Sequence, residues 1–482
     1  MTEGREAPRM TQAVGTSLIA RIKGLAKLWL DVAGSAKGGE TLSFAPDLPD
    51  DDLERLRKQM LACLEGKGGE VSARARAAAL GREYLSLSAE GRRRFLRLMA
   101  GFGPDTARVG GATQALLAAG DDDQARLSAE AALRTALEPP YARLLTQFNA
   151  LPEGVKFLVD LRAELMGMAK GDARLTALAK ELKDLLAAWF DVGFLELQRI
   201  TWRSPACVLE KIMAYEAVHA IQGWGDLKNR LDSDRRLYAF FHPRMPEEPL
   251  IFVEVALVRG IAGNVHELLD PHAPVGNPDE ADTAIFYSIN NAQRGLDGIS
   301  FGNFLIKKVV EELSREFPKL KNFATLSPLP GFRPWLVEKL AEGEAGLLLP
   351  AEHRTLTQLS NGQGAKGSLK ALVDDGDWAN DPMIAETLRA PLTRLAARYV
   401  AQEKRAGQGR ALDPVAHFHL SNGARVERLN WLADTSAKGM KQSLGLMINY
   451  LYKLDEIETN HESYSGTGKV AVSSDIRGLL KV

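Results

Sequence analysis

The sequence predicts an α+β chain with an all-α first part, and three observations support this. Residues 1 to about 190 contain runs of helical length that are rich in Ala, Leu, Arg and Glu. After residue 190, short β-branched and aromatic runs appear. Helical patterns separate these runs, an alternation that by itself fits an α/β or an α+β arrangement. We therefore expect two domains, residues 1–190 and 191–482.

The first part is expected to be a helical bundle. Its clearest helical stretches are SARARAAALGREYLSLSAEGRRRFLRLMAGFG and DDDQARLSAEAALRTALEPPYARLLTQFNAL. Asp50, Asp51 and Asp52 precede LERLRKQMLACL and predict a capped helix start. This part shows no residues at a spacing diagnostic of chemistry and no solenoid repeat. We expect it to pack, dock or oligomerise.

The second part alternates between the two kinds of pattern. Five runs are expected to be strands: RLYAFF, EPLIFVEVALVRG, DTAIFYSI, KNFATLS and PVAHFHLSNG. Three stretches are expected to be helices: FGNFLIKKVVEELSREF, PMIAETLRAPLTRLAARYVAQEKR and SLGLMINYLYKLDEI. Residues 359–370, LSNGQGAKGSLK, are polar and predict a mobile stretch.

Composition excludes several classes of protein. A net charge of −1 argues against bulk nucleic acid or an anionic membrane as the main partner. The two cysteines, Cys63 and Cys207, form neither a CxxC motif nor a Cys/His cluster, so we expect a reducing compartment and no structural zinc. No apolar run approaches the roughly 20 residues that span a bilayer. The first ten residues lack a signal-peptide core. We expect a bacterial cytoplasmic protein, with the mitochondrial matrix as the alternative.

One segment has the features of an anion-binding loop. Residues 284–317 run from a strand, AIFYSI, through NNAQRGLDGIS to an amphipathic helix. The loop carries Gly295, Gly298 and Gly302 with Arg294 beside them, and it fits neither a Walker A loop nor GxGxxG. Glycines let backbone N–H groups approach a ligand, and a helix N-terminus favours negative charge. The alternative is a glycine-rich turn that binds nothing.

Ser327 lies in TLSPLPGF at the end of a short apolar run. Pro328 removes a donor from the sheet and pushes Ser327 toward extended geometry. Pro330 and Gly331 then predict a turn. The sequence therefore holds a hydroxyl at the mouth of a strand in a stiff loop.

Two histidines follow in PVAHFHLSNG. On a strand, His417, His419 and Ser421 would share one face. No third metal ligand is evident at a suitable spacing, so a metal site is not predicted. A histidine held by packing is the common case, whereas one that faces a pocket could exchange a proton near neutral pH. Ser327 with such a histidine suggests a Ser-His pair, although the chain has no GxSxG elbow.

Several long blocks, taken in order, resemble the malonyl-CoA decarboxylase family. FYSINNAQRGLDGISFGNFLIKKVVEELSREFPKLKNFATLSPLPGFRPWL is similar to that family's central motif, and DPVAHFHLSNGARVERLNWLAD followed by NYLYKLDEI is similar to its C-terminal motif. WRSPACVLEKIMAYEAVHAIQGWGDLKNRL and EPLIFVEVALV are also family-like. The resemblance covers residues 150–465 well and the helical front more loosely.

The resemblance implies a fold and a reaction. The fold would be a helical domain joined to a mixed-sheet catalytic domain of the acetyltransferase-like (GNAT) type. The reaction would convert malonyl-CoA to acetyl-CoA and carbon dioxide in fatty acid metabolism, without metal or cofactor, since CoA is part of the substrate. The resemblance also implies a homotetramer, assembled through the helical domain.

The resemblance further implies site residues. The catalytic positions match Ser327 and His419, with Ser288 and Tyr452 completing a polar wall. The glycine loop would hold the CoA pyrophosphate through the following residues: Arg294, Gly295, Gly298, Ile299, Ser300 and Gly302. Ser300 stands where relatives often carry an acidic residue, which puts any electrostatic role of that acid in doubt here.

Three other functions remain open from the sequence. A GNAT acyltransferase would share the loop but need an amine acceptor. A thioesterase using Ser327 and His419 would release free CoA and malonate. A CoA-binding or helical interaction protein would bind without turnover.

Overall fold

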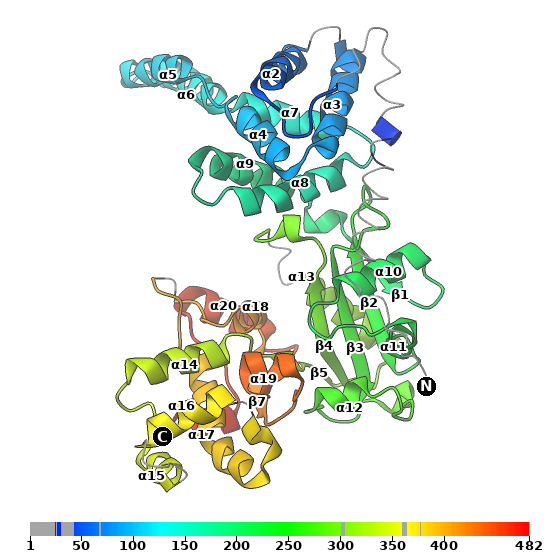
Figure 1. The fold of residues 1–482 in the computed structure, drawn as a ribbon, viewed down its shortest axis with the longest axis vertical. Coiled ribbons are helices and arrows are strands. Elements are labelled where there is room, and N and C mark those ends of the chain that lie inside the picture. The colour runs from blue at the N-terminus through cyan, green and yellow to red at the C-terminus, as the bar shows by residue number, and fades with distance from the viewer. Residues whose placement is uncertain are drawn as a thin grey trace, which may run out of the picture. The chain divides into compact units, whose positions relative to one another are not determined.

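A computed structural model describes residues 25, 27–29, 43–66, 69–299, 304–358, 364–375, 377–407 and 409–481. The chain forms two compact units, each described by itself (Figure 1). The first unit extends to Leu195 and includes His242–Glu248 and residues 293–299. The second unit contains the sheet and the remaining helices. An α+β fold with a helical first part is thereby confirmed. Among the described residues, no helix is both long and apolar enough to cross a membrane.

The first unit is a set of α-helices packed around aromatic side chains. Phe157 lies at the centre, with ring centroids 4.8 Å from Trp29, 5.8 Å from Tyr84 and 5.3 Å from Phe148. Edge-on aromatic pairs of this kind add to the burial of their area. The helices are α2 (Asp50–Leu64), α3 (Gly69–Ser86), α4 (Ala89–Ala100), α5 (Thr106–Ala118), α6 (Asp123–Leu137), α7 (Pro140–Asn149), α8 (Gly154–Met168) and α9 (Ala173–Trp189).

Helix starts in this unit follow capping chemistry, with one correction. Asp105, Asp122 and Asp172 accept main-chain N–H groups at the starts of α5, α6 and α9. The capped start predicted at residues 50–52 is wrong, because α2 begins at Asp50 and its N-cap is Pro49 without a side-chain bond. The three aspartates instead occupy the first turn, where their charge favours the helix dipole.

The second unit is built on one eight-stranded sheet among the described residues. Its order is β1-β2-β3-β4-β5-β8-β6, and β7 also pairs with β8. The strands are β1 (Glu196–Ile200), β2 (Arg235–Phe241), β3 (Ile251–Val258), β4 (Thr283–Asn291), β5 (Asn322–Thr325), β6 (Ser327–Pro328), β7 (Arg425–Asn430) and β8 (Met447–Leu451). The predicted strands over RLYAFF, EPLIFVEVALVRG, DTAIFYSI and KNFATLS are confirmed.

Helices lie between the strands of this sheet in the sequence and follow its last strand. They are α10 (Ala206–Tyr215), α11 (Trp224–Arg230), α12 (Val265–Leu269), α13 (Phe304–Glu316), α14 (Phe332–Glu342), α15 (Pro350–Gln358), α16 (Gly364–Asp375), α17 (Pro382–Ala401), α18 (Pro414–Ser421), α19 (Ala437–Ser443), α20 (Ile457–Thr467) and α21 (Ser474–Leu480). The predicted helices at 304–316 and 382–401 are confirmed. Short 3-10 turns lie at Val192–Phe194, Pro278–Glu280, Arg294–Leu296 and Asp377–Asn380.

Strands β4 and β5 are parallel neighbours that part at their carboxyl ends. They pair from Thr283 with Asn322 to Phe286 with Thr325. Beyond that point β4 continues along β3, whereas β6 pairs with β8. Ligands in open sheets bind outside the carboxyl ends of parallel strands where neighbouring connections diverge.

Two sequence predictions in this unit are wrong, and the mobile stretch at 359–370 stays a prediction. Residues 414–421 form helix α18 and not a strand, because Asp413 caps the helix and Pro414 occupies its first position. Residues 447–451 form strand β8 inside the predicted helix, since all five are buried between other strands. Residues 364–370 belong to α16, whereas 359–363 lie outside the described residues.

Candidate active site

Ser327 lies where β5 gives way to β6. It is buried, and its hydroxyl donates to Thr325 Oγ1 at 2.9 Å. Thr325 and Ser327 are two residues apart in extended chain, so their side chains share one face. The main-chain N–H of Tyr450 also donates to Thr325 Oγ1 at 3.2 Å. The sheet thus fixes the hydroxyl that the sequence singled out.

His419 reaches Ser327 from helix α18. Its Nε2 lies 3.2 Å from Ser327 Oγ, across 92 positions of sequence. Helical spacing turns Ala416, His419 and Leu420 inward, and all three are buried. The imidazole also stacks on Tyr450, with centroids 4.6 Å apart. His417 instead contacts the Tyr464 hydroxyl at 2.9 Å, so the two histidines have different partners.

Tyr452 completes the chain of contacts. Its hydroxyl lies 2.8 Å from His419 Nδ1, and it follows the last residue of β8. We call Thr325, Ser327, His419, Tyr450 and Tyr452 the Ser327 cluster. The structure brings together three residues that the sequence predicted, and it adds Thr325 and Tyr450. Alternation along β8 would have indicated Tyr450 beside Tyr452 if that segment had been read as a strand.

Burial keeps the Ser327 cluster neutral. Desolvation lowers the pKa of His419 to about 3, and it raises the pKa of Tyr452 well above its usual value. At neutral pH the imidazole therefore has one proton, on Nδ1 or on Nε2. If Nε2 has the proton, it donates to Ser327 while Tyr452 donates to Nδ1; the other tautomer lets Ser327 donate to Nε2.

A second polar group supports the strand that carries Thr325. Asn449 in β8 donates to the carbonyl of Thr325 at 2.7 Å, and its Oδ1 accepts from Asn430 at 2.8 Å. Arg428 also donates to Asn449 Oδ1 at 3.2 Å. A fully hydrogen-bonded buried network of this kind rigidifies its surroundings.

Ser288 has its hydrogen bonds in a separate cluster. Its hydroxyl donates to Glu216 at 2.8 Å, and Asn290 donates to the same carboxylate at 2.6 Å. A β-bulge causes this, because Glu254 pairs with Ser288 while Val255 pairs with Phe286. The extra residue moves Ser288 to the face of Glu254, opposite to Phe286. The polar wall predicted for Ser288 and Tyr452 is therefore divided between two sets of partners.

The cluster around Ser288 contains two buried carboxylates, Glu216 and Glu254. Glu254 is fully buried, and desolvation together with the nearby Glu216 raises the pKa of Glu254 to about 8. The Arg230 guanidinium lies 3.1 Å from the Glu254 carboxylate and opposes this rise in pKa. Sequence reasoning missed Glu216, although it lies within a quoted family-like block, since a lone carboxylate in a loop has no diagnostic spacing.

The predicted CoA loop is fixed to helix α8 in the first unit. Arg162 donates to the carbonyl of Gly295 at 2.6 Å and to that of Asp297 at 2.9 Å. A Cβ on Gly295 would overlap the Val159 carbonyl, so this glycine is required by packing. Gly298 has φ +75°, which favours glycine.

The remaining loop residues are placed only in part. Arg294 is exposed, and the N–H of Ile299 donates to Leu296 O at 3.0 Å. Ser300 and Gly302, two of the predicted CoA-binding residues, lie outside the described residues. The described loop therefore offers a cation and a left-handed glycine, together with the main chain between them.

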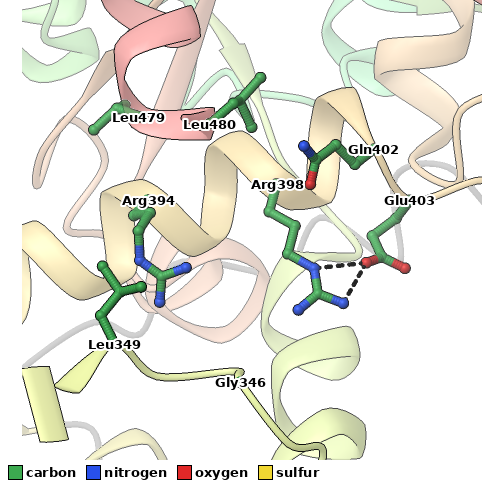
Figure 2. Close-up of a pocket in the computed structure, with 8 residues that line it drawn as sticks. All are labelled: Gly346, Leu349, Arg394, Arg398, Gln402, Glu403, Leu479 and Leu480. Carbon is green, nitrogen blue, oxygen red and sulfur yellow. Dashed lines mark hydrogen bonds and ion pairs between the residues drawn. The ribbon is translucent and has the colours of Figure 1, made fainter. Parts of the chain in front are cut away.

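A pocket of about 420 Å³ lies elsewhere in the second unit (Figure 2). Arg394 and Arg398 point into it, but Arg394 is paired with Glu352 at 2.6 Å and Arg398 with Glu403 at 2.9 Å. The pocket shares no residue with the Ser327 cluster, and its charges are compensated. Its lining is Gly346, Leu349, Arg394, Arg398, Gln402, Glu403, Leu479 and Leu480.

The Ser327 cluster can orient a substrate and relay a proton. A hydroxyl and a neutral imidazole can each donate or accept, and they are positioned by a sheet and a helix. The partner of His419 Nδ1 is a tyrosine hydroxyl and not a carboxylate. An imidazolium formed by serine attack would lack the stabilising anion of a Ser-His-Asp triad.

Comparison with known proteins identifies relatives. Residues 193–482 match the malonyl-CoA decarboxylase C-terminal domain, and residues 102–190 match the malonyl-CoA decarboxylase N-terminal domain. The mitochondrial malonyl-CoA decarboxylase of Rattus norvegicus is 40% identical over 399 residues, covering 80% of each chain. That of Anser anser anser is 38% identical over 421 residues, covering 84% of this chain and 83% of the relative.

Solved structures agree. The malonyl-CoA decarboxylase of Rhodopseudomonas palustris is 41% identical, with a TM-score of 0.80 over 89% of this chain and 99% of that one. The enzyme of Agrobacterium vitis is 42% identical with the same TM-score, over 89% of this chain and 100% of that one. The chain belongs to the malonyl-CoA decarboxylase family.

Proposed function

We infer that this protein is a carboxy-lyase that converts malonyl-CoA to acetyl-CoA and carbon dioxide. The observation that carries this is the contact between Ser327 and His419 beside the parting of β4 and β5, in a chain of this family. The resemblance implies that no metal and no cofactor take part. The protein's own groups then supply the chemistry.

Decarboxylation leaves two electrons that flow into the thioester carbonyl. The transition state is enolate-like, and negative charge grows on the carbonyl oxygen. A preorganised donor at that oxygen contributes roughly 3 to 4 kcal/mol. The breaking C–C bond must also stand out of the thioester plane, which is a task of positioning. One proton is taken up at carbon for each carbon dioxide released.

His419 is proposed to hydrogen-bond the malonyl end and to help protonate the enolate carbon. Burial favours its neutral form in the free protein. The substrate carboxylate brings a negative charge that favours imidazolium. Loss of carbon dioxide moves this charge into the enolate, and transfer of the proton to carbon returns His419 to the neutral form. Ser327, in contact with His419, would orient the carboxylate or pass the proton.

The other predicted residues have supporting roles in this proposal. Tyr452 would hold the His419 ring through Nδ1, at the observed 2.8 Å. Ser288 would line the carboxyl end of β4, fixed by Glu216. The CoA pyrophosphate would lie on the loop of Arg294, Gly295, Gly298 and Ile299, continued by Ser300 and Gly302. What supports this is the left-handed Gly298 and the exposed cation beside it.

A GNAT-type sheet is part of the proposal. It is supported by the antiparallel run from β1 to β4, the parallel pair β4–β5, and their divergence after Phe286 and Thr325. An acyl chain entering between diverging strands would meet Ser327 at one of them.

Assembly and location are also proposals. A homotetramer through the helical unit is supported by the exposed leucines of α5 and α6. A cytoplasmic location is supported by two free cysteines, Cys63 and Cys207.

A single incubation tests the reaction. Purified protein is mixed with malonyl-CoA and a chelator in deuterated buffer without an acceptor, and CoA species are followed by mass spectrometry. We expect acetyl-CoA with solvent deuterium in its methyl group at catalytic turnover. Free CoA with malonate would indicate a thioesterase, which the Ser327–His419 contact makes the second candidate. Unchanged malonyl-CoA would refute the decarboxylase, and amine acceptors would then test for an acyltransferase.

A further inference from the structure

Asp413 caps the helix that carries His419. Its side chain is fully buried, with an exposed fraction of 0%. Oδ1 accepts the main-chain N–H of Val415 at 2.9 Å and that of Ala416 at 2.8 Å. These are two of the donors that a helix start leaves without an intrahelical partner. The direction of the first turn of α18 therefore depends on this carboxylate.

The second oxygen of Asp413 faces the loop that follows Ser327. Oδ2 accepts the Tyr399 hydroxyl of α17 at 3.2 Å. A Cβ on Gly331 would overlap that hydroxyl and lie 3.8 Å from Oδ2. Gly331 is four residues beyond Ser327, and Pro328 and Pro330 lie between them. Because proline fixes φ, a shift at Gly331 is transmitted to Ser327 with little relaxation.

Hydrogen bonds hold this carboxylate, which makes no ion pair with any residue that the structure describes. Burial raises the pKa of Asp413, and bonds from Ala416, the Tyr399 hydroxyl and the amides of Gly331 and Val415 oppose the rise. What matters at this position is therefore the placement of acceptor atoms. Asparagine keeps one acceptor oxygen and is as good an N-cap as aspartate, but it places an N–H2 donor where the second oxygen accepts.

We propose that Asp413 is a positioning residue that sets the separation of Ser327 and His419. One oxygen starts the helix that carries the imidazole, and the other fixes the turn that follows the hydroxyl. The proposal rests on the decarboxylase function for its effect on turnover. The Ser327–His419 contact of 3.2 Å is already long, so a small movement of helix α18 or of the turn after Ser327 breaks it. A misplacement of about 1 Å is expected to lower turnover by roughly 10²-fold.

The test compares Asp413→Ala with Asp413→Asn and with a matched cap. Asp381 makes the same pair of bonds at the start of α17, to Met383 N and Ile384 N, and it also precedes a proline. It is exposed and lies at the opposite end of α17 from Tyr399. We expect D413A to lose about 10²-fold in kcat with KM for malonyl-CoA nearly unchanged. D381A should stay within about threefold of the parent, since it leaves helix α18 and the turn at Gly331 in place. D413N keeps the cap oxygen but turns an N–H2 toward Gly331 and Tyr399, so its loss should lie between those of D381A and D413A.

A second readout does not depend on turnover. Carbethoxylation of His419 by diethyl pyrocarbonate, mapped by mass spectrometry, reports whether the imidazole is still packed. We expect slow modification in the parent and in D381A, and fast modification in folded D413A. If the parent does not decarboxylate malonyl-CoA, the proposed function fails, whereas this readout still decides the role of Asp413.

Two outcomes overturn the proposal. One is a folded D413A with parental kcat and parental His419 reactivity. The other is an equal loss of kcat in D381A. If D413A does not fold, Tyr399→Phe decides, since it keeps the helix cap and removes the bond to Oδ2. Parental kcat in that variant would likewise refute the role.

Discussion

At the scale of residues, the hydroxyl of Ser327 has one hydrogen and two neighbours able to accept it. Thr325 Oγ1 lies 2.9 Å away and His419 Nε2 lies 3.2 Å away. The shorter contact favours Thr325 as the resting acceptor, which leaves His419 Nε2 free to donate toward Ser327. A substrate carboxylate would compete for both protons. The cluster is thus suited to hold an anion before it moves a proton.

Replacing either residue by alanine tests this assignment. We expect His419→Ala and Ser327→Ala each to lower kcat for malonyl-CoA by at least ~10²-fold, the scale of a positioned acid-base group. Steady-state assays of acetyl-CoA release measure it. His417→Ala is the control, because His417 lies in the same helix but contacts Tyr464. Near-parental turnover in either variant would remove that residue from the mechanism.

The burial of His419 predicts how stability depends on pH. Its pKa is about 3 in the folded protein, and an unfolded histidine titrates near 6.5. Below pH 6.5 the unfolded state therefore binds a proton that the folded state does not, and the free energy of unfolding falls by about 1.4 kcal/mol per pH unit from this group. His419→Asn should abolish that share of the acid sensitivity.

Urea unfolding at pH 7.5 and 5.5 measures the effect. The loss of stability between the two pH values should be smaller by about 1 kcal/mol in His419→Asn than in the parent. His219, whose pKa burial lowers to about 4, contributes equally to both proteins and cancels. Equal losses would show that the folded protein protonates His419 as readily as the unfolded chain does.

At the scale of elements, sequence patterns succeeded where burial is one-sided or complete over a long run. Strands β2, β3 and β4 were predicted from runs of β-branched and aromatic residues, nearly all of them buried. Helices α13 and α17 were predicted from their helical patterns. Helix α18 was missed because it has only eight residues, and because His417, Phe418 and His419 alternate as they would in a strand. The start signal Asp413-Pro414 was not weighed. Strand β8 was missed because a run of five buried residues, mostly apolar, fits a helix or a strand equally.

The sequence predicted residues of the candidate site, but it did not predict their contacts. Ser327 and His419 came first from local sequence patterns, and the family resemblance added Tyr452. Their contact needs the long-range pairing of β8 with β5 and β6. No local signal indicates that a residue in a loop, such as Glu216, will meet Ser288 across 72 positions. The β-bulge that re-aims Ser288 is likewise a property of the paired strands.

Gly295 offers a test of how the loop after β4 is held. A Cβ there would overlap the Val159 carbonyl of α8, so Gly295→Ala must displace the loop or the helix. We expect a loss of stability of about 1 to 3 kcal/mol, as for other overpacked positions. Gly110→Ala in α5 is the control, because nothing lies within 4 Å of its added methyl and the change favours helix. Chemical denaturation that ranks G295A at or above G110A would contradict the packing role.

At the scale of the whole molecule, the proposed CoA loop belongs to the helical unit. Its residues 293–299 group with that unit and not with the sheet. The helical front is therefore expected to contribute to ligand binding and not only to assembly. Arg162 is the residue through which this is tested, since it holds the carbonyls of Gly295 and Asp297.

Arg162→Ala should weaken the binding of acetyl-CoA. Without its two hydrogen bonds the loop loses its fixed shape, and ordering it on binding costs free energy. We expect the Kd, measured by isothermal titration calorimetry, to rise about tenfold. Arg174→Ala on the exposed surface of α9 is the control. An unchanged Kd in a folded R162A variant would take this loop out of the CoA site.

Assembly is the last property of the whole molecule that the structure allows to be tested. None of the residues of α5, all of them described, is buried, and in α6 only Ala129 and Ala136 are. Leu117, Leu127 and Leu137 are exposed by 79%, 59% and 51% on this hairpin. Apolar area of this kind on a helical hairpin is typical of a protein interface.

The proposed homotetramer should give a mass near four chains of 52.6 kDa each in light scattering during size exclusion. Leu117→Asp combined with Leu127→Asp should yield smaller species, because a buried carboxylate without a partner opposes association. Gln114→Asp adds charge at an exposed polar position of the same helix and should leave the mass unchanged. A parental mass in the double variant would place the interface on other elements, and a monomeric parent would refute the tetramer itself.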